Sequence, residues 1–337
     1  MTTPDNIEKD YPSKERKPRM NKRVGFWAIV GAALTGLVLS GGTAVMAQSS
    51  VRPAESVVDL NAVKDPAAPI PMTYSISTCG AHSIKARGIN PYWEPLIPGV
   101  KHVSWRKLGT DDFRKVYTVL DETVKFDVPG IGKVEAAVIE EREILNGVLR
   151  QVSHNWYAFC EENNNILSVG ETSAHLKADG KSVADTEGTW RAGLANDKGE
   201  RAIVAVAIAG TPSLGAKWIF DGAPGIALGG AEVVATGLKT VNGKLTTVKT
   251  RYYKGETIEI PLAKKVGDFS GCVQVEELSQ FSDSRKPNLD DPTNKVFCPG
   301  AGLVFDTSDG VLIENNVLTD AALKFQIDAF ILYNKKK

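Results

Sequence analysis

The sequence predicts a mainly β protein, built as an antiparallel curved sheet or an incomplete barrel. Three observations predict this class. Short runs rich in β-branched and aromatic residues are separated by Gly, Pro and Asp along most of the chain. Two of the intervening turns are Asn-Gly pairs, which favour tight β-hairpins. Patterns with helical spacing are scarce.

The N-terminal segment indicates export. The first 23 residues carry seven Lys or Arg and four Asp or Glu, whereas residues 24–47 carry no charge. About 20 apolar residues suffice to cross a bilayer, and the loosening of the stretch before Ala47 is typical of a cleavable signal peptide. We therefore predict a signal peptide or membrane anchor over residues 1–47. The remainder is then periplasmic or extracellular, and membrane contact is limited to residues 24–47 if they are not removed.

The exported part divides into three segments. Residues 48–71 lack periodicity and predict a linker, residues 72–316 form the β domain, and residues 317–337 are a C-terminal extension. Apolar residues at helical spacing within 319–337 predict a short helix, although alternation in the same stretch leaves a strand open. Of the 40 basic and 40 acidic side chains, seven and four lie in the first 23 residues, so the exported part has a formal charge of −3. This balance gives no reason to expect a nucleic-acid partner.

The strands are predicted in two groups around the Asn-Gly turns. Asn146-Gly147 joins two β-rich runs, and Asn242-Gly243 joins two more. One stretch, residues 200–215, is Ala-rich and fits either a buried strand or a short apolar helix. The predicted strands cover residues 101–105, 114–120, 133–144, 148–159, 231–241, 244–253, 256–262, 271–281, 294–300 and 301–307.

The four cysteines all lie in the exported part, where thiols are usually oxidised. They permit three pairings. Cys272 and Cys298 fall in neighbouring strand-like runs separated by a polar loop, which favours this pair and therefore Cys79 with Cys160.

Metal and cofactor chemistry finds little support in the residue pattern. Cys79, His82, His154 and Cys160 could form a four-ligand set, but their spacing is not a recognised zinc signature. No C-x-x-C-H motif for haem attachment is present. The Gly-rich run at 227–232 lacks the Lys-Ser/Thr of a phosphate-binding loop and is interpreted as a turn. We predict neither a metal nor a cofactor.

Catalytic groups are equally hard to find. No G-x-S-x-G motif is present, and Ser153 and His154 face opposite ways on a strand. Glu141 and Glu143 share one strand face and could serve as acid and base. The solvated outer face of a hairpin explains them more simply.

Aromatic residues offer a candidate ligand site. Trp156 and Tyr157 are neighbours on a predicted strand and therefore face opposite sides of the sheet, with His154 on the Trp156 side. Together with Trp190, these side chains could line an apolar cavity in a curved sheet. Packing in a solid core explains the rings as well.

Several segments in order resemble a family of exported bacterial β-rich proteins without an established activity. They include INPYWEPLIPG at 89–99, HNWYAFC at 154–160, GTWRAGL at 188–194 and FCPGAGLVF at 297–305. The resemblance implies an exported β domain from about residue 88 to residue 314. The chain departs from the family at 226–230, where similar proteins carry carboxylates.

The sequence therefore predicts a non-catalytic envelope protein that binds a small apolar ligand or a partner protein. Two alternatives remain open, an envelope hydrolase with an unidentified active site and a membrane-anchored structural subunit of a larger complex.

Overall fold

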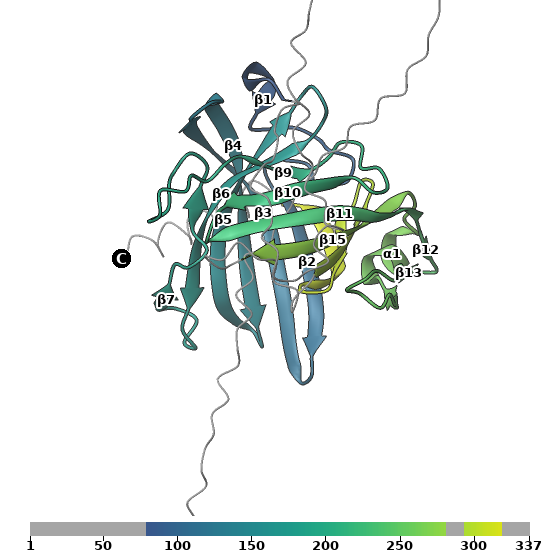
Figure 1. The fold of residues 1–337 in the computed structure, drawn as a ribbon. Helices are drawn as coiled ribbons and strands as arrows, with labels where there is room; N and C mark the ends of the chain where they lie inside the picture. The colour runs from purple at the N-terminus through teal and green to yellow at the C-terminus, as the bar shows by residue number, and fades with distance from the viewer. Residues whose placement is uncertain (1–78, 281–292, 319–337) are drawn as a thin grey trace, which may run out of the picture.

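The computed structural model describes residues 79–280 and 293–318 (Figure 1). The predicted signal or anchor segment, the linker and the C-terminal helix lie outside these residues. Within them, nearly all regular structure is β-strand, with one short α-helix and one short 3-10 helix. The predicted fold class is therefore confirmed. No helix in the described ranges is long and apolar enough to span a membrane.

The elements follow one another along the chain with few interruptions. They are η1 (Ala81–Ser83), β1 (Ile84–Lys85), β2 (Val100–Leu108), β3 (Asp111–Val128), β4 (Gly132–Leu145), β5 (Val148–Cys160), β6 (Ile166–Leu176), β7 (Val183–Asp185), β8 (Trp190–Arg191), β9 (Ala205–Ile208), β10 (Lys217–Ala223), β11 (Ala227–Leu238), β12 (Thr240–Val241), β13 (Lys244–Thr246), β14 (Thr257–Glu259), α1 (Pro261–Val266), β15 (Cys272–Gln280), β16 (Thr293–Cys298), β17 (Gly302–Asp306) and β18 (Gly310–Val317).

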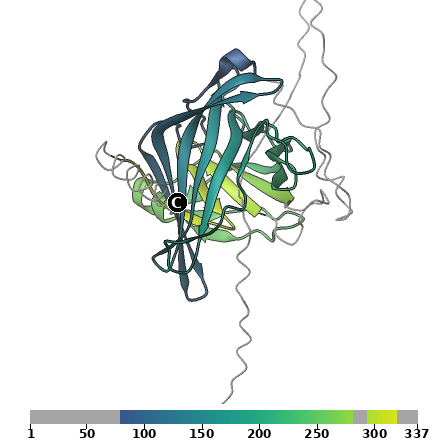
Figure 2. The same ribbon diagram turned by 90° about the vertical axis from the view of Figure 1, so that its left-hand side faces the viewer.

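Fifteen of the strands form one antiparallel sheet, in the order β10-β11-β15-β16-β17-β18-β2-β3-β4-β5-β6-β7. β1 pairs with β5, and β8 and β9 both pair with β6. The long strands β3 to β6 lie side by side and curve together (Figure 2). A separate three-stranded sheet contains β12, β13 and β14.

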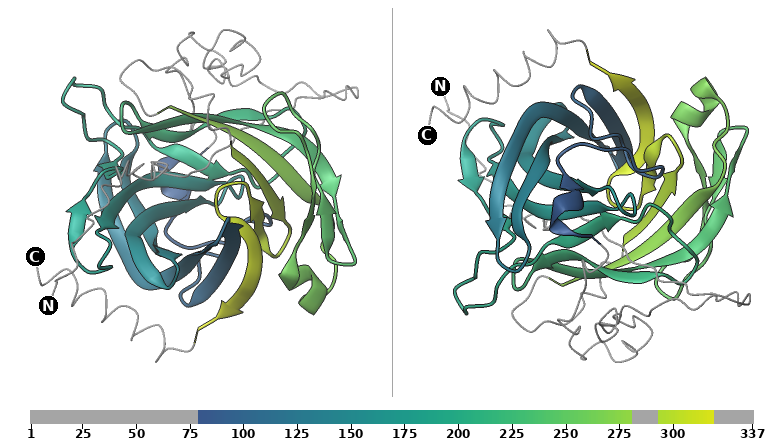
Figure 3. Two further views of the ribbon diagram at one scale, coloured as in Figure 1. Left: turned by 90° about the horizontal axis from the view of Figure 1, so that it is seen from below. Right: turned by 90° about the horizontal axis from the view of Figure 1, so that it is seen from above.

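The large sheet curls around its core without closing into a barrel (Figure 3). Its two ends approach each other where β9, which is paired to β6, comes near β10. Here the backbone N–H of Ile203 donates a hydrogen bond to the carbonyl of Gly222, with an N···O distance of 2.9 Å. We call this junction between the chain before β9 and strand β10 the seam.

Both Asn-Gly turns form as predicted. Asn146 and Gly147 have φ angles of 51° and 77°, the left-handed conformation that a two-residue type I′ hairpin requires. Asn242 and Gly243 adopt φ angles of 53° and 71°. The second hairpin is shorter than predicted, because only β12 and β13 pair across it.

Two other sequence interpretations are settled by tertiary packing. The ambiguous stretch 200–215 contains the buried strand β9 and no helix. The Gly-rich run 227–232, interpreted as a turn, lies inside strand β11. A Cβ atom on Gly229 would lie 2.3 Å from the ring of Phe220, so glycine at this position lets β11 pack closely on the aromatic side chain. The turn interpretation was wrong because composition alone does not reveal this contact.

The predicted disulfide pairing is confirmed. Cys79 bonds to Cys160 and thereby ties the start of the described chain to the end of β5. Cys272 bonds to Cys298, joining the first residue of β15 to the last residue of β16. The second bond lies in a smaller apolar core between the large sheet and the β13–α1 region, whereas the main core fills the curl of the sheet.

Candidate functional site

The inner face of the curved sheet carries a row of polar side chains across β2 to β6. Register places His102, Tyr117, Glu141, Ser153 and Ser173 side by side across β2 to β6. Residues directly opposite each other share a face, so these side chains all point inward. All five are buried. The centre of the molecule is therefore not a uniform apolar core.

Lys115 lies at the middle of this polar region, with its side chain only 2% exposed. Its Nζ atom is 2.8 Å from Glu141 Oε1, 3.1 Å from Asp309 Oδ2 and 3.4 Å from Glu143 Oε1. Burial opposes the charge, but the three carboxylates together raise the pKa of Lys115 well above its ordinary value. The solvated outer face predicted for Glu141 and Glu143 was wrong, because both carboxylates turn inward to this lysine.

A second buried lysine continues the cluster. Lys295 Nζ is 2.7 Å from Glu277 Oε2 and 3.7 Å from Asp306 Oδ2. Burial again disfavours the ammonium, and the attraction of Glu277 and Asp306 more than compensates, so the pKa of Lys295 is raised. Asp309 acts electrostatically on both lysines, which makes them parts of one network. We call these groups, together with Glu171 and Asp221, the buried charged cluster.

Glu171 and Asp221 are the unbalanced members of the cluster. Burial raises the pKa of Glu171 well above its ordinary value, and the charge on Glu141 raises it further, against the opposing effect of Lys115. The pKa of Asp221 is also raised well above its ordinary value, chiefly by burial and then by the charge on Glu171. The Oδ1 atom of Asp221 has no hydrogen-bond partner among the described residues. These carboxyl groups are therefore protonated over much of the range where ordinary carboxylates are charged.

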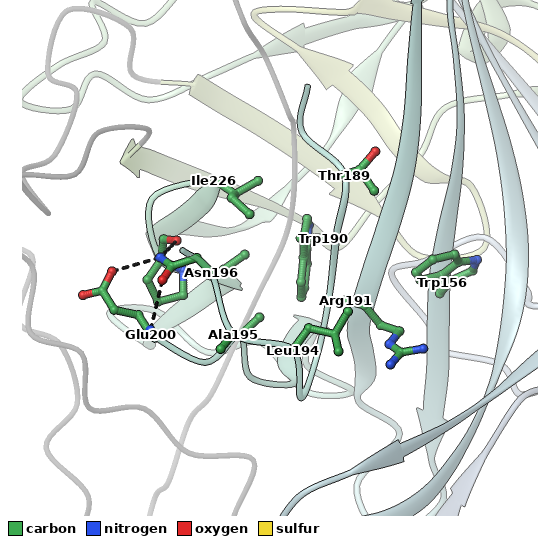
Figure 4. Close-up of a pocket in the computed structure, with 12 residues that line it drawn as sticks. Trp156, Thr189, Trp190, Arg191, Leu194, Ala195, Asn196, Glu200 and Ile226 are labelled. Carbon is green, nitrogen blue, oxygen red and sulfur yellow. Dashed lines mark hydrogen bonds between the residues drawn. The ribbon is translucent and has the colours of Figure 1, made fainter. Parts of the chain in front are cut away.

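An apolar pocket of about 340 Å³ lies at the edge of the curl, near the seam (Figure 4). It is formed by β5, by β8 and the loop that follows it, and by the turn between β10 and β11. The walls are mainly apolar. The lining residues are Trp156, Thr189, Trp190, Arg191, Leu194, Ala195, Asn196, Glu200, Ala202, Ala223, Pro224 and Ile226.

Gly170 of β6 allows the backbone of β8 to lie close to the ring of Trp156. Its φ of 149° is one that side chains rarely adopt, and a Cβ there would lie 2.6 Å from Trp190 O and 3.0 Å from the ring of Trp156. Register pairs Gly170 with Trp156 on one side and with Arg191 on the other. The absence of a side chain thus brings β8 and the Trp156 ring together at the pocket.

The loop after β8 is held in place by Asn196. Its Oδ1 atom accepts hydrogen bonds from the backbone N–H groups of Lys198 and Glu200, both at 3.0 Å. Its Nδ2 group donates to the carbonyl of Pro224 at 3.0 Å, which links the loop to the β10–β11 turn. The outer wall of the pocket is therefore preorganised.

A few polar groups remain at the pocket. The Nε1 group of Trp190 and the Nε group of Arg191 are buried without a hydrogen-bond partner in the described part of the chain. The Arg191 guanidinium carbon lies 5.4 Å from the centre of the Phe126 ring, and this ring packs at 4.9 Å against Trp156. An apolar pocket with a small number of oriented polar groups is the usual form of a small-molecule site.

The four predicted ligand-binding residues separate in the structure. Trp156 and Trp190 line the pocket. His154 lies on the same strand face as Trp156, but its ring is buried beside Glu140, with Nε2 3.4 Å from Oε2. Tyr157 points to the opposite face and packs edge-on against Trp93 with ring centres 5.1 Å apart.

Sequence reasoning did not single out Arg191, Leu194 or Ile226. The segment GTWRAGL contained a usable indication, because Arg191 directly follows Trp190, which was already a candidate. Nothing local to Ile226 connects it to this segment, since the β10–β11 turn reaches the pocket only through the fold.

The four-ligand metal set considered from the sequence does not exist, because Cys79 and Cys160 are bonded to each other. No other group of three or more His, Cys, Asp or Glu side chains within residues 79–280 and 293–318 is arranged to hold a metal ion.

The fold and the pocket define a disulfide-linked, curved antiparallel β protein with a preformed apolar site. No family model, curated protein or solved structure matches the chain. The resemblance to an exported bacterial β-rich family therefore stays a prediction.

Proposed function

We propose that the protein is an exported envelope protein that binds a small, mainly apolar ligand in the pocket between Trp156, Trp190 and Ile226. The observation that carries this proposal is the pocket itself. Its volume of about 340 Å³ lies at the lower end of the range for small-molecule sites, roughly 300–1,000 Å³. A small ligand, and not a long lipid, fits such a volume.

The composition of the pocket supports an apolar ligand. The deeper part is formed by Trp190, Ala202 and Ala223, which are buried. At the rim, Leu194 leaves 51% of its surface exposed. Burial of a ligand against such surface is favourable by roughly 25 cal/mol for each Å² of apolar area removed from water.

The two disulfides are compatible with the proposed location. Disulfides persist in the periplasm and outside the cell, where thiols are not kept reduced. Export through residues 1–47 rests on the sequence pattern and is part of the proposal.

An envelope hydrolase is the second candidate, and the buried charged cluster favours it. Perturbed carboxyl groups are common in active sites, and burial raises the pKa of both Glu141 and Glu277 to about 7. These groups do not line the pocket, and the lysines that they contact give them a structural role. Ligand binding therefore accounts for more of the observed geometry.

The test uses the full chain purified from the envelope fraction. Native mass spectrometry should reveal a bound small molecule that is lost after extraction with organic solvent, and the extracted protein should bind added decanol. Ala195→Trp places a bulky side chain at the exposed rim and should reduce binding at least about tenfold, equivalent to 1.4 kcal/mol. Leu214→Trp, at a position 67% exposed and not among the pocket-lining residues, is the matched control.

Two results would contradict the proposal. One is the repeated absence of any adduct together with no binding of decanol. The other is binding that Ala195→Trp and Leu214→Trp leave equally unchanged.

A further inference from the structure

The polar groups of the pocket are distributed unevenly. Figure 4 places Arg191 beside Trp156 on one side and Glu200 with Asn196 on the other. Glu200 is held there by Asn196, whose Nδ2 group donates to Oε2 over 3.0 Å. The pocket therefore has a cationic side and an anionic side, separated by the apolar surface of Trp190 and Ile226.

Arg191 is not neutralised by a carboxylate of the described chain. No salt bridge joins it to an acidic side chain within residues 79–280 and 293–318, and its buried Nε group donates to none of their atoms. Arg142 and Arg114 behave differently, because each binds a carboxylate, Glu140 at 2.7 Å and Asp112 at 3.1 Å. An arginine beside an apolar pocket keeps its capacity for a ligand when no side chain occupies it.

The pairing of β8 with β6 explains why the buried carboxylate of Glu171 does not reach Arg191. Glu171 of β6 stands opposite Trp190, whereas Arg191 stands opposite Gly170. Neighbouring side chains on a strand point to opposite faces, so Glu171 and Arg191 are directed to different sides of the sheet. The position across from Arg191 carries no side chain at all.

The guanidinium is oriented by aromatic rings. It lies over Phe126, which packs against Trp156, and stacking of this kind restricts the plane of the group. A planar guanidinium pairs best with a planar carboxylate, through two parallel hydrogen bonds. A single arginine also balances the single charge of a carboxylate, whereas a phosphate dianion would keep an unbalanced charge.

We propose that Arg191 binds the carboxylate of an amphiphilic ligand, such as a short fatty acid, whose apolar body lies against Trp190 and Ile226. The inference rests on the proposed binding function and adds the chemical class of the ligand. Glu200 gives the site a direction, because its negative charge disfavours a carboxylate at the opposite side of the pocket.

The experiment compares decanoate and decanol, which share one chain length and differ in the head group. Binding to the full-length protein, freed of its own ligand, is measured by isothermal titration. Decanoate should bind about ten- to hundredfold more tightly than decanol, in line with charge-assisted hydrogen bonds.

Variants at Arg191 separate charge from geometry. Arg191→Met should remove the advantage of decanoate over decanol, measured as the ratio of the two affinities in the same variant. Arg191→Lys keeps the charge without the planar group and should retain only part of the advantage. Arg114→Met, which removes an arginine half-exposed beside Asp112 and outside the pocket lining, should change nothing.

The possible failures are distinguishable. If neither decanoate nor decanol binds to the unmodified protein, the proposed function itself is overturned. If both bind with equal affinity and Arg191→Met has no effect, the pocket stands and the head-group inference is overturned. Equal weakening of both ligands by Arg191→Met and Arg191→Lys would assign Arg191 a structural role and would also overturn the inference.

Discussion

The Nζ atom of Lys115 lies 2.8 Å from Glu141 Oε1 inside the curved sheet, where the two side chains are 2% and 1% exposed. Burying an ion pair at this depth removes the hydration of both charges, and this cost offsets much of the electrostatic attraction between them. Once formed, however, neither partner can be removed alone without leaving the other charge in a medium that solvates it poorly. The buried charged cluster therefore ties β3, β4 and the β17–β18 turn together as a unit.

Lys115→Met should destabilise the protein by about 3–5 kcal/mol, because Glu141 and Asp309 would lose their counter-ion. Urea denaturation monitored by tryptophan fluorescence measures the change. The matched control is Lys125→Met, which removes a lysine 75% exposed and 3.6 Å from Glu135, and it should have no measurable effect. Equal stability of the two variants would show that the cluster does not hold the strands together.

Stability should fall as the pH rises from about 4 to about 7. Burial raises the pKa of Glu141 and of Glu277 to about 7, and that of Glu171 and Asp221 also lies above the ordinary value. The unfolded chain loses these protons near pH 4, whereas the folded protein keeps them, so raising the pH favours the unfolded state over this window. Urea midpoints measured across the window test the sign.

Replacing Asp221 with asparagine should remove part of this dependence of stability on pH. Asp221→Asn cannot ionise, so it should stabilise the protein at neutral pH and change its stability little near pH 4. Asp179→Asn is a suitable comparison, because hydrogen bonds from Ser182 and Lys181 lower the pKa of this exposed carboxyl to about 2. That variant should not gain stability at neutral pH. A loss of stability in Asp221→Asn at neutral pH would contradict the prediction.

Gly229→Ala should destabilise the protein by about 1–3 kcal/mol, because the added methyl group meets the ring of Phe220. Phe220→Leu removes part of that ring and creates space at the same point. In a double-mutant cycle, Gly229→Ala should therefore cost less in the Phe220→Leu background than in the unmodified protein. Strict additivity would place the strain elsewhere.

The two disulfides should contribute unequally to the free energy of unfolding. In the chain-entropy model, loss of Cys79–Cys160, which spans 81 residues, costs about 4.5 kcal/mol, and loss of Cys272–Cys298, which spans 26, costs about 3.5 kcal/mol. Paired Cys→Ala variants and urea denaturation measure the order. A thiol titration of the oxidised protein should detect none of the four sulfurs, and a reactive thiol would contradict the pairing.

The sequence predicted those features of the fold that depend on local chemistry. Asn146-Gly147 forms its turn because both residues tolerate the left-handed conformation, and the alternating runs beside it are long strands as expected. Cys272 and Cys298 pair because their strands are neighbours. None of these features required knowledge of distant contacts.

The features that could not be predicted depend on residues far apart in the chain. Glu141 and Glu143 have the composition of a solvated strand face, and only the fold brings Lys115 and Asp309 against them. The pocket likewise combines β5, β8 and the β10–β11 turn, so its apolar lining has no pattern in any single segment. Trp156 and Trp190 were identified as candidates for lining an apolar cavity, but Arg191, Leu194 and Ile226, which line it with them, were not.

The seam lies directly beside the pocket. Ala202 and Ala223, which line the pocket, are the chain neighbours of Ile203 and Gly222, whose backbone hydrogen bond joins the two ends of the sheet. Separation at this junction breaks isolated contacts and not a continuous ladder, and each such hydrogen bond has a net worth of about 0.5–1.5 kcal/mol. An incompletely closed sheet can therefore open at this junction while the long strands stay fully paired, which would give the proposed ligand a way in and out.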